Sequence, residues 1–599
     1  MKKIISGNFF TIIILFSLLV YFLYINLNLP FMTYDESQAV FNSFKEQLVI
    51  NLNFGRISHY PALILNELLS FPTPNIIGQL KRFSTIVFLI VALYTYFQHL
   101  GFQRKLSIIV ILIIFSLHQL DWQHNGLVSF FGGYNVYLGL FLIAIILYEK
   151  YEIKKQIKSN KIFFVIFSAI FLSYSSELFV GLSFIYAIVY ALNGGKKWYL
   201  SPFLLCATFY AIMYFFMQSF TLHEKSEIMK EYLSGSFSHF TVFQMIQGTM
   251  LYTINSLPFY NNIGLSHSVS FFSSSLLLVT VLALLMVKAR KTYTEGGSKN
   301  VLFWAGKYHI FIWLALFIVP SVLMSFQSMK LSWILNGQSN RYVFSYYTWI
   351  SLVIILLIVF NGFLVNNYRK LLVLLSPFIV YSVYSNIKFV GGYKEINNSW
   401  NEINNIIEKS ELNTIVKIPR YYFMTKNISI ISPDTLASMI SNKFDKELLV
   451  CDDYSEMSLA HMESLSLSGF YDWEGIGRWT KKSESSLIIP VALEKGTIVS
   501  FSVVNAIGKN KSSPIEVFLN NQKELITLDE FFPKDQKIKL NENVEELNIR
   551  IKIPYPTKPI DLGIEDDVRE LGIMIGKVAI YRPNNGLESA SPIEKCIKY

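Results

Sequence analysis

Two adjacent carboxylates, Asp35 and Glu36, follow the first apolar stretch of the chain and stand among the hydroxyl and aromatic side chains of residues 31–37. A carboxylate can take a proton from an attacking hydroxyl, or bind that hydroxyl through hydrogen bonds, when it lies within bonding distance. A helix cap or an interfacial charge would give the same pattern. The pair is the first candidate for general-base chemistry.

Cationic residues close to the same expected surface are candidates for binding a phosphate. An arginine guanidinium can hold phosphate through two parallel N–H bonds, which a lysine cannot do. The alternative for each cation is that it merely reaches the phosphates of ordinary lipids. The candidates are Arg341 with the neighbouring Tyr342, Arg56 and His59 in the first long loop, and Lys81 and Arg82 before the second apolar stretch.

Two acidic residues stand in short polar interruptions of apolar sequence. Glu177 is the only charge in residues 162–195, and a charge within membrane-spanning sequence marks a functional site by default. The serines before it predict a tight turn, which would leave Glu177 at the membrane interface. Asp121 lies between His118 and His124, but this spacing matches no standard zinc pattern, so no metal is expected.

The composition excludes a single water-soluble unit. Hydrophobic residues make up 52% of the 599 residues and charged residues 16%, whereas soluble domains carry about 25% charged residues. Residues 1–387 hold 26 basic and 12 acidic residues, while residues 388–599 hold 26 and 30. The basic excess therefore belongs to a membrane part and does not indicate a partner nucleic acid. No phosphate-cradling loop of the ATPase type is present.

Eleven apolar stretches are long enough to be candidate membrane helices, since a span needs about 20 apolar residues. Glu149, Glu152 and Glu295 fall in Lys-rich connections between them and are expected to be solvated charges. The predicted spans are 9–29, 83–100, 106–120, 127–148, 162–176, 178–193, 198–219, 265–287, 308–325, 342–365 and 371–387.

The distribution of Lys and Arg predicts the orientation, because cytoplasmic connections carry the positive excess. With a cytoplasmic N-terminus, the inner connections hold 18 of these residues and the longer outer connections hold eight. An odd number of spans then places the C-terminal part outside the membrane. The first outer loop contains apolar Leu63, Ile64, Leu68 and Leu69 at helical spacing, which fits a helix lying at the interface or one packed on the bundle.

The C-terminal part is predicted to contain two regions. Residues 391–465 combine a helical spacing of Ile396, Trp400, Ile403 and Ile407 with a strand at 414–418, as in a small α/β element. From residue 466 to the end, short β-rich runs alternate with turn residues, which is typical of an antiparallel β-sandwich. The clearest runs are 486–490, 497–504, 515–519, 547–553 and 577–581.

The carboxylate pair, the first outer loop, Gly55-Arg56, the Glu177 turn and Asn340-Arg341-Tyr342 together resemble the GT-C superfamily of polytopic glycosyltransferases over residues 1–390, in particular bacterial enzymes that decorate O-antigen or other surface polysaccharide. The resemblance implies a polyprenyl-phosphate sugar as donor, Asp35 as catalytic base, Glu36 as a helper, and Arg341 or Arg56 as the ligand of the donor phosphate. Some relatives use a metal, but a leaving group with one phosphate does not require one, so no resident cofactor is expected. The role of Glu177 rests on its position only.

Residues 470–582 resemble the β-sandwich appended to some bacterial surface-glycan enzymes. The motifs are Glu474–Trp479, Pro556–Pro559, Asp561–Gly563 and Asp566–Ile573. Such modules are similar in shape to carbohydrate-binding sandwiches, so Trp473 and Trp479 are candidates for stacking on sugar rings; core tryptophans are the alternative. Of three cysteines, Cys206 lies in an expected span, and Cys451 and Cys596 can form a disulfide in an oxidising compartment.

The sequence thus predicts an inverting glycosyltransferase of the bacterial inner membrane, with its C-terminal domain in the periplasm. It would transfer a sugar from a lipid-phosphate donor to a glycan acceptor, with a donor synthase and a flippase as partners. Two alternatives stay open. One is a glycan polymerase or ligase that uses diphosphate-linked donors, and the other is a non-enzymatic flippase or sensor.

Overall fold

The computed structural model describes the chain in segments. These are residues 2–29, 59–69, 76–120, 125–153, 161–192, 201–221, 241–258, 301–325, 344–410, 415–419, 446–453, 456–459, 466–528, 532–563, 567–581 and 594–598, with single positions between 273 and 283, 331 and 335, and 437 and 444. The chain divides into two compact units, Met1–Asn401 and Glu402–Tyr599.

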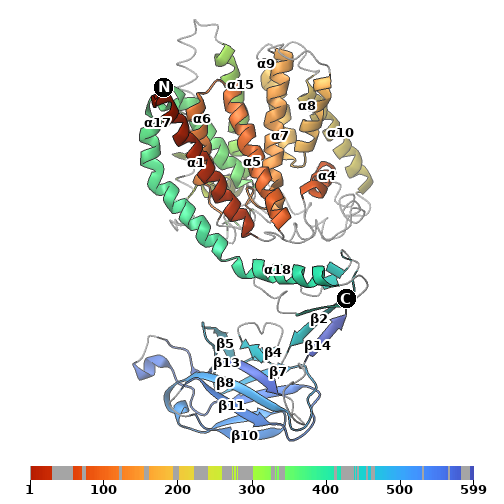
Figure 1. Ribbon diagram of the computed structural model, residues 1–599, viewed down its shortest axis with the longest axis vertical. Coiled ribbons are helices and arrows are strands. Elements are labelled where there is room, and N and C mark those ends of the chain that lie inside the picture. The colour runs from red at the N-terminus through yellow and green to blue at the C-terminus, as the bar shows by residue number, and fades with distance from the viewer. Residues whose placement is uncertain are drawn as a thin grey trace. The chain divides into compact units, whose positions relative to one another are not determined.

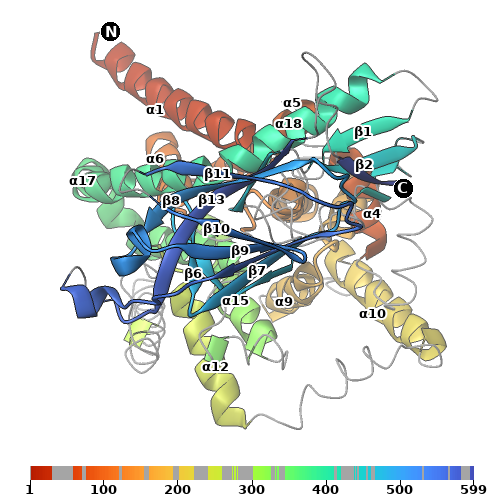
Figure 2. The ribbon, with the colours of Figure 1, turned by 90° about the horizontal axis from the view of Figure 1, so that it is seen from below.

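The first unit is helical (Figure 1). Seen end-on, α1, α10 and α12 lie at its periphery (Figure 2). Its elements are α1 (Lys2–Leu27), α4 (His59–Leu69), α5 (Ile76–His99), α6 (Arg104–Ser116), the short 3₁₀ turn η1 (Phe130–Gly132), α7 (Gly133–Tyr148), the π-helical turn η2 (Glu149–Ile153), α8 (Lys161–Ser173), α9 (Leu178–Leu192), α10 (Pro202–Thr221), α12 (Val242–Asn255), α15 (Val301–Ser325) and α17 (Ser345–Gly391), followed by α18 (Lys394–Lys409).

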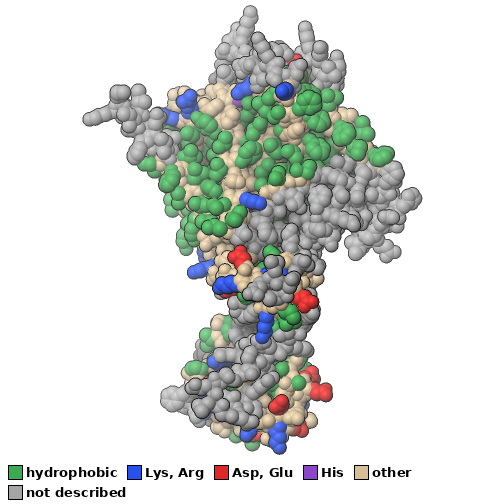
Figure 3. All heavy atoms as spheres, turned by 45° about the vertical axis from the view of Figure 1, so that its right-hand side comes forward, with side chains coloured by type: hydrophobic (Ala, Val, Ile, Leu, Met, Phe, Trp, Pro, Cys, Tyr) green, Lys and Arg blue, Asp and Glu red, His purple; other side chains and the backbone are tan. Residues whose placement is uncertain are grey.

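Three helical segments in the described part of the chain are long and apolar enough to cross a membrane: Ile76–His99, Phe130–Glu152 and Ser345–Gly391. Five further apolar helices are shorter. Large apolar side chains such as Phe164, Phe215 and Val373 are exposed on this unit, and Figure 3 shows hydrophobic side chains covering much of its visible face. Exposed apolar surface of this kind is what contact with lipid requires.

The expected count of eleven spans is not supported by the described residues. From Ser345 onward, the predicted spans 342–365 and 371–387 both fall on the single helix α17, which also contains Arg369 and Lys370. Arg369 and Lys370 indicated a connection outside a helix, but both residues are helical.

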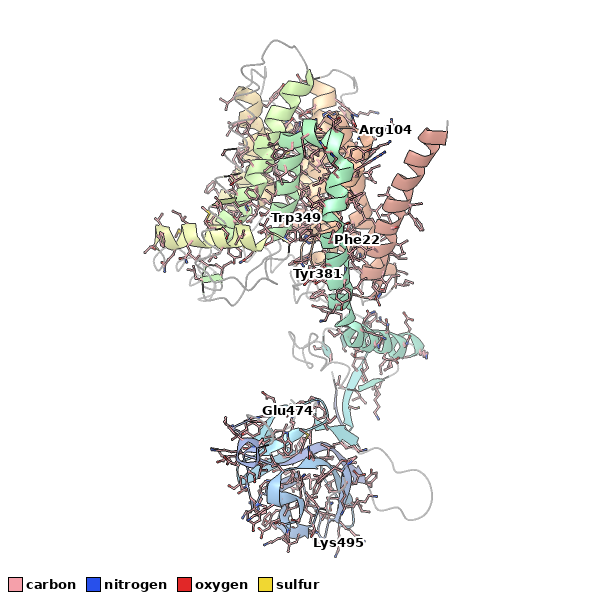
Figure 4. All side chains as sticks on the ribbon, turned by 90° about the vertical axis from the view of Figure 1, so that its left-hand side faces the viewer. Phe22, Arg104, Trp349, Tyr381, Glu474 and Lys495 are labelled. Atoms are coloured by element: carbon pink, nitrogen blue, oxygen red, sulfur yellow. The ribbon has the colours of Figure 1, made fainter. Side chains whose placement is uncertain are left out.

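Although α17 is uninterrupted, it cannot be straight. Tyr346, near its start, contacts the His118 ring at a centroid distance of 5.3 Å, and Asn386, near its end, donates a hydrogen bond to the His118 carbonyl. A straight helix would separate these two positions by about 60 Å at 1.5 Å per residue. The helix therefore folds back on itself, and Trp349 and Tyr381 lie in the same half of the unit (Figure 4).

The second unit consists of antiparallel sheets and one small mixed sheet. The five-stranded sheet has the order β10-β9-β12-β7-β4, and the larger one has the order β11-β8-β13-β6-β5 with β3 paired to β13. The strands are β3 (Glu456–Ser458), β4 (Ser466–Ser468), β5 (Phe470–Trp473), β6 (Arg478–Lys481), β7 (Glu484–Ile489), β8 (Ile498–Ala506), β9 (Ile515–Leu519), β10 (Gln522–Ile526), β11 (Lys534–Lys539), β12 (Leu547–Lys552) and β13 (Leu571–Tyr581).

One hydrophobic core joins these two antiparallel sheets. Leu487, Val517 and Ile549 come from the five-stranded sheet, and Phe501 and Ile575 from the larger one. Alternate residues point into the core, as along β9, where Ile515, Val517 and Leu519 are buried. The predicted antiparallel sheet region is confirmed, and the expected strand 515–519 has the bounds of β9.

A third sheet holds β1 (Val416–Pro419), β2 (Leu448–Asp453) and β14 (Glu594–Lys598). β1 pairs with β2 in parallel, and β14 pairs with β2 in antiparallel register, with Cys596 directly opposite Cys451. Cys451 is disulfide-bonded and Cys206 is free. The predicted pairing of Cys451 with Cys596 fits this register.

Candidate functional site

A cluster of buried polar side chains lies at the end of the helical unit where α1 ends and α5, α7 and α17 begin. Its charged member is Arg82, whose side chain is fully buried. Arg82 Nη1 donates a hydrogen bond to the carbonyl of Leu29, 3.2 Å away, at the end of α1. A buried guanidinium requires polar partners because its desolvation is costly. Arg82 therefore does not extend outward to the phosphates of surrounding lipids.

Asn135 links three elements within this cluster. Its side-chain nitrogen donates to Thr85 Oγ1 on α5, at 3.1 Å, and to the carbonyl of Leu127, at 2.9 Å. Its side-chain oxygen accepts a bond from the Tyr346 hydroxyl on α17, at 2.5 Å. Thr85 in turn donates to the Arg82 carbonyl. All these side chains are buried, so the network fixes α5, α7 and α17 relative to one another.

The backbone just before α7 is wound in the left-handed sense. Phe130 and Phe131 both have φ of 54°, and Gly132 has φ of 74°. A left-handed conformation is costly for a non-glycine residue and is concentrated at functional sites. At Gly132 an added Cβ would lie 2.1 Å from Thr85 Oγ1. Only glycine lets η1 approach α5 this closely, and this approach brings Asn135 within reach of Thr85.

The segment after α6 is held by side-chain amides. His118 Nε2 bonds with Asn125 Oδ1 at 2.9 Å, and Asn125 Nδ2 donates to the Gln119 carbonyl. From the end of α17, Asn386 donates to the His118 carbonyl and accepts from the Leu120 amide, both at 2.8 Å. These bonds fix both flanks of residues 121–124, which contain the Asp121 and His124 considered above and lie outside the described residues.

Most of the predicted catalytic and phosphate-binding residues lie outside the described residues. This applies to Asp35, Glu36, Arg56, Arg341 and Tyr342. His59 is the first residue of α4, and its side chain is likewise not among those described. The helix predicted around Leu63 is α4, which exposes Ile64 and Leu68 and buries Leu65. It contacts α5, α7, α8 and η1, and so packs on the bundle.

The remaining predicted residues of the helical unit are described. Lys81 and Arg82 lie in the first two turns of α5, where Lys81 is half-buried and Arg82 is fully buried. Glu177 is exposed in the turn between α8 and α9, which is the tight turn that the serines predicted. The structure brings Arg82 into the polar cluster and leaves Glu177 on the surface.

The two tryptophans of the second unit do not form an exposed stacking surface. Trp479 is buried in a cluster with Ile507, Leu571 and Met574, which fits the alternative of a core tryptophan. Its position on β6 in a sheet interior explains the burial. Trp473 is half-buried and packs against the main core.

A charged group surrounds the Tyr471 ring at one end of the second unit, the end at which Figure 4 labels Glu474. Arg569 lies 5.1 Å and Lys481 Nζ 5.2 Å from the ring centroid. Arg569 bonds with Asp567 and pairs with Glu474. The hydrogen bonds from Arg569 lower the pKa of Asp567, and those to Asp567 and Glu474 raise the pKa of Arg569.

The expectation that Glu149 is a solvated charge is wrong. Glu149 is buried where α7 passes into η2, and its carboxylate contacts His99 Nε2 at 2.6 Å and His309 Nε2 at 3.0 Å. The Tyr186 hydroxyl donates to the same carboxylate. The neighbouring lysines suggested a water-exposed connection, but the helix continues through residue 149 and turns this side chain into the bundle.

Sequence reasoning also missed Asn135 and Tyr346. A signal was available for Asn135, which follows Gly132 and Gly133 within otherwise apolar sequence, since a polar residue inside a span usually faces the bundle interior. Tyr346 carries no such signal, because tyrosines are common throughout this chain. Its role depends on the fold-back of α17.

No family model, curated protein or solved structure matches this chain. Within the described part of the chain, no group of three or more His, Cys, Asp and Glu side chains is arranged to hold a metal ion. The polar cluster around Arg82 and Asn135, together with the segments that start from it, is the candidate site.

Proposed function

We propose that this protein is a glycosyltransferase of the bacterial inner membrane that moves a sugar from a polyprenyl-phosphate carrier to a hydroxyl of a surface glycan on the periplasmic side. The observation that carries the proposal is the fully buried Arg82, bonded to the end of α1. It supplies a fixed positive charge at the base of the segment that carries Asp35, in a bundle whose outer surface is apolar.

Chain length limits how far Asp35 and Arg341 can lie from this cluster. Asp35 follows Leu29 by six residues, so the two are at most about 22 Å apart even in a fully extended chain. Arg341 precedes Phe344 by three residues, which limits that separation to about 11 Å. Leu29 bonds with Arg82, and Tyr346 bonds with Asn135. The chain segments that lead from Leu29 to Asp35 and from Phe344 to Arg341 therefore both begin next to the same polar cluster.

In the proposed reaction, the Asp35 carboxylate takes the proton of the acceptor hydroxyl as its oxygen attacks the anomeric carbon. The bond between that carbon and the donor phosphate oxygen breaks, and the polyprenyl phosphate leaves with the electron pair. Arg341 or Arg56 holds the phosphate charge that develops, while Glu36 orients the acceptor. A single displacement inverts the anomeric carbon. Burial of Arg82 favours an electrostatic role beneath the site over direct contact with the donor.

Glycan analysis of a deletion strain, complemented with variants, tests the proposal. Loss of the gene is expected to remove one sugar residue from the surface polymer, and the wild-type gene restores it. Asp35→Asn is expected to be inserted normally and to restore nothing, because the amide cannot accept the proton. Lys105→Gln, an exposed change at the far end of α6, serves as the control and restores the sugar. An unchanged glycan in the deletion strain contradicts the function, and full restoration by Asp35→Asn removes this residue from the mechanism.

The alternative of a non-enzymatic lipid-glycan flippase is favoured by one observation, the ionisable His99–Glu149–His309 group inside the bundle. Such groups occur in transporters that couple movement to protons. A flippase would translocate the carrier lipid equally well with Asp35→Asn. Measuring translocation of a fluorescent polyprenyl phosphate in reconstituted vesicles separates the two functions.

A further inference from the structure

A second buried polar group lies far from the candidate site, near the opposite end of α5. Arg82 and His99 both belong to α5 and are separated by 17 residues, or about 25 Å of helix. The group consists of His99 and Tyr96 from α5, Glu149 from α7 and η2, Tyr186 from α9, and His309 and Trp313 from α15. Four helices therefore meet at one carboxylate.

The net charge of this group indicates that it holds a proton. If both imidazoles were neutral, the ionised Glu149 would leave one net negative charge buried in the bundle, where an uncompensated charge is costly. One added proton makes the group neutral. Two groups bond with the carboxylate, His99 Nε2 and the Tyr186 hydroxyl, and His309 Nε2 lies 3.0 Å from it. Hydrogen bonds donated to a carboxylate stabilise its ionised form. The added proton therefore belongs on a histidine.

The hydrogen bonds of Tyr96 identify which histidine carries the added proton. The Trp313 indole nitrogen can only donate, and it donates to the Tyr96 oxygen at 2.9 Å. The single hydroxyl hydrogen of Tyr96 then has His309 Nδ1, at 2.7 Å, as its acceptor. A ring nitrogen accepts only when it carries no proton, so His309 is neutral with its hydrogen on Nε2, facing Glu149. Protonating Nδ1 would leave the buried Tyr96 hydroxyl hydrogen without an acceptor among the described residues.

His99 is the remaining carrier. Its Nε2 lies 2.6 Å from Glu149 Oε2, as close as a charge-assisted hydrogen bond. His99 is also the last residue of α5, and Gly101 and Arg104 just beyond it are exposed.

We propose that His99, Glu149 and His309 form an intramembrane proton-binding site, in which His99 carries the proton, Glu149 is ionised and Tyr96 keeps His309 neutral. The ligand is the proton itself. Its loss leaves an unbalanced carboxylate among α5, α7, α9 and α15, so the packing of these four helices depends on the occupancy of the site. This inference does not depend on the glycosyltransferase proposal.

The test is nitrogen NMR of the full-length protein, labelled with ¹⁵N-histidine and reconstituted in lipid nanodiscs at pH 7. The chain has nine histidines, and His99→Gln and His309→Gln each identify one by loss of its signals. We expect both ring nitrogens of His99 at protonated shifts, and one protonated and one unprotonated nitrogen for His309. A neutral His99, or a charged His309, in the wild-type protein overturns the proposal.

Two further variants examine the individual contacts. In Glu149→Gln the charge balance no longer requires the proton, so His99 is expected to lose one protonated-nitrogen signal. In Tyr96→Phe the hydroxyl that donates to His309 Nδ1 is lost, so the His309 signals are expected to change. The His99 signals are expected to stay the same. A His99 that keeps both protons in Glu149→Gln contradicts the assignment. If either variant does not fold, the wild-type signals alone decide.

Discussion

Tyr346 and Asn386, forty residues apart in one uninterrupted helix, both contact His118. Tyr346 does so through its ring and Asn386 through a hydrogen bond to the carbonyl. The first half of α17 is buried on nearly all sides from Ser345 to Ile355, whereas much of its second half is exposed. The fold-back therefore combines a central limb with an outer limb, and His118 is the point at which the two ends meet.

Removing the Asn386 amide is expected to destabilise the helical unit. Asn386→Leu leaves the His118 carbonyl and the Leu120 amide buried without this partner, each at a cost of about 1–3 kcal/mol. Asn367→Leu is the matched control, because Asn367 is half-buried and its side chain donates to the Phe363 carbonyl of its own helix. Thermal unfolding in detergent measures both. Equal midpoints for the two variants would show that the contact with the His118 segment contributes little.

Gly132→Ala is expected to destabilise the protein by at least about 2 kcal/mol, since the added Cβ meets Thr85 Oγ1 and the residue has φ of 74°. Gly181→Ala on α9 should do the reverse, because nothing lies within 4 Å of that Cβ and alanine favours a helix by about 1 kcal/mol. The same melting assay compares them. A neutral effect of Gly132→Ala would mean that η1 moves away from α5 freely.

The pKa of Asp567 is expected to depend on Arg569. The hydrogen bonds from Arg569 lower this pKa below its ordinary value of 3.8, so the folded state is stabilised above that pH and loses this contribution as the pH falls through the lowered pKa. Arg569→Gln should raise the pKa, as measured by ¹³C-carboxyl NMR.

Glu516 provides an independent comparison for the same titration. Its pKa is lowered by the hydrogen bond from Lys523. Lys523→Gln should therefore raise the pKa of Glu516 and leave that of Asp567 unchanged. If Arg569→Gln shifts both carboxyls equally, the effect is a general change in the charge of the unit and does not come from the local bonds.

Reducing the Cys451 disulfide is expected to destabilise the second unit by about 2–4 kcal/mol. Cys451→Ser should unfold at the temperature of the reduced wild-type protein and should no longer respond to reductant. Cys206→Ser keeps the response, because Cys206 is free. A wild-type midpoint that is the same with and without reductant would show that the small mixed sheet does not depend on this bond.

The β-strands were predictable because alternation is a local property. Ile515, Val517 and Leu519 point inward at every second position, which identified β9 to the residue. The burial of Trp479 was not predictable to the same degree, since it depends on Ile507 and Leu571, which come from other parts of the chain.

The helical unit illustrates the opposite case. Hydropathy identified apolar stretches but could not tell that residues 345–391 are helical throughout, because charged residues are compatible with a helix surface. The lysines near Glu149 led to the wrong prediction that its charge is solvated. Its partners His99 and His309 lie 50 and 160 residues away in sequence. Asn135 and Arg82 acquire their environment in the same way, through contacts that only the folded bundle creates.

The fold-back of α17 brings both ends of this helix to the same end of the bundle. Because the chain enters and leaves this helix next to His118, residues Phe344 and Tyr393 emerge at the same end of the bundle, the end that also holds Arg82. Asn398, exposed on α18 within the same unit, is joined to that end by the bond between Gln79 and the neighbouring Asn397. A membrane-impermeant reagent directed at a cysteine in place of Asn398 therefore reports the sidedness of Arg82 as well.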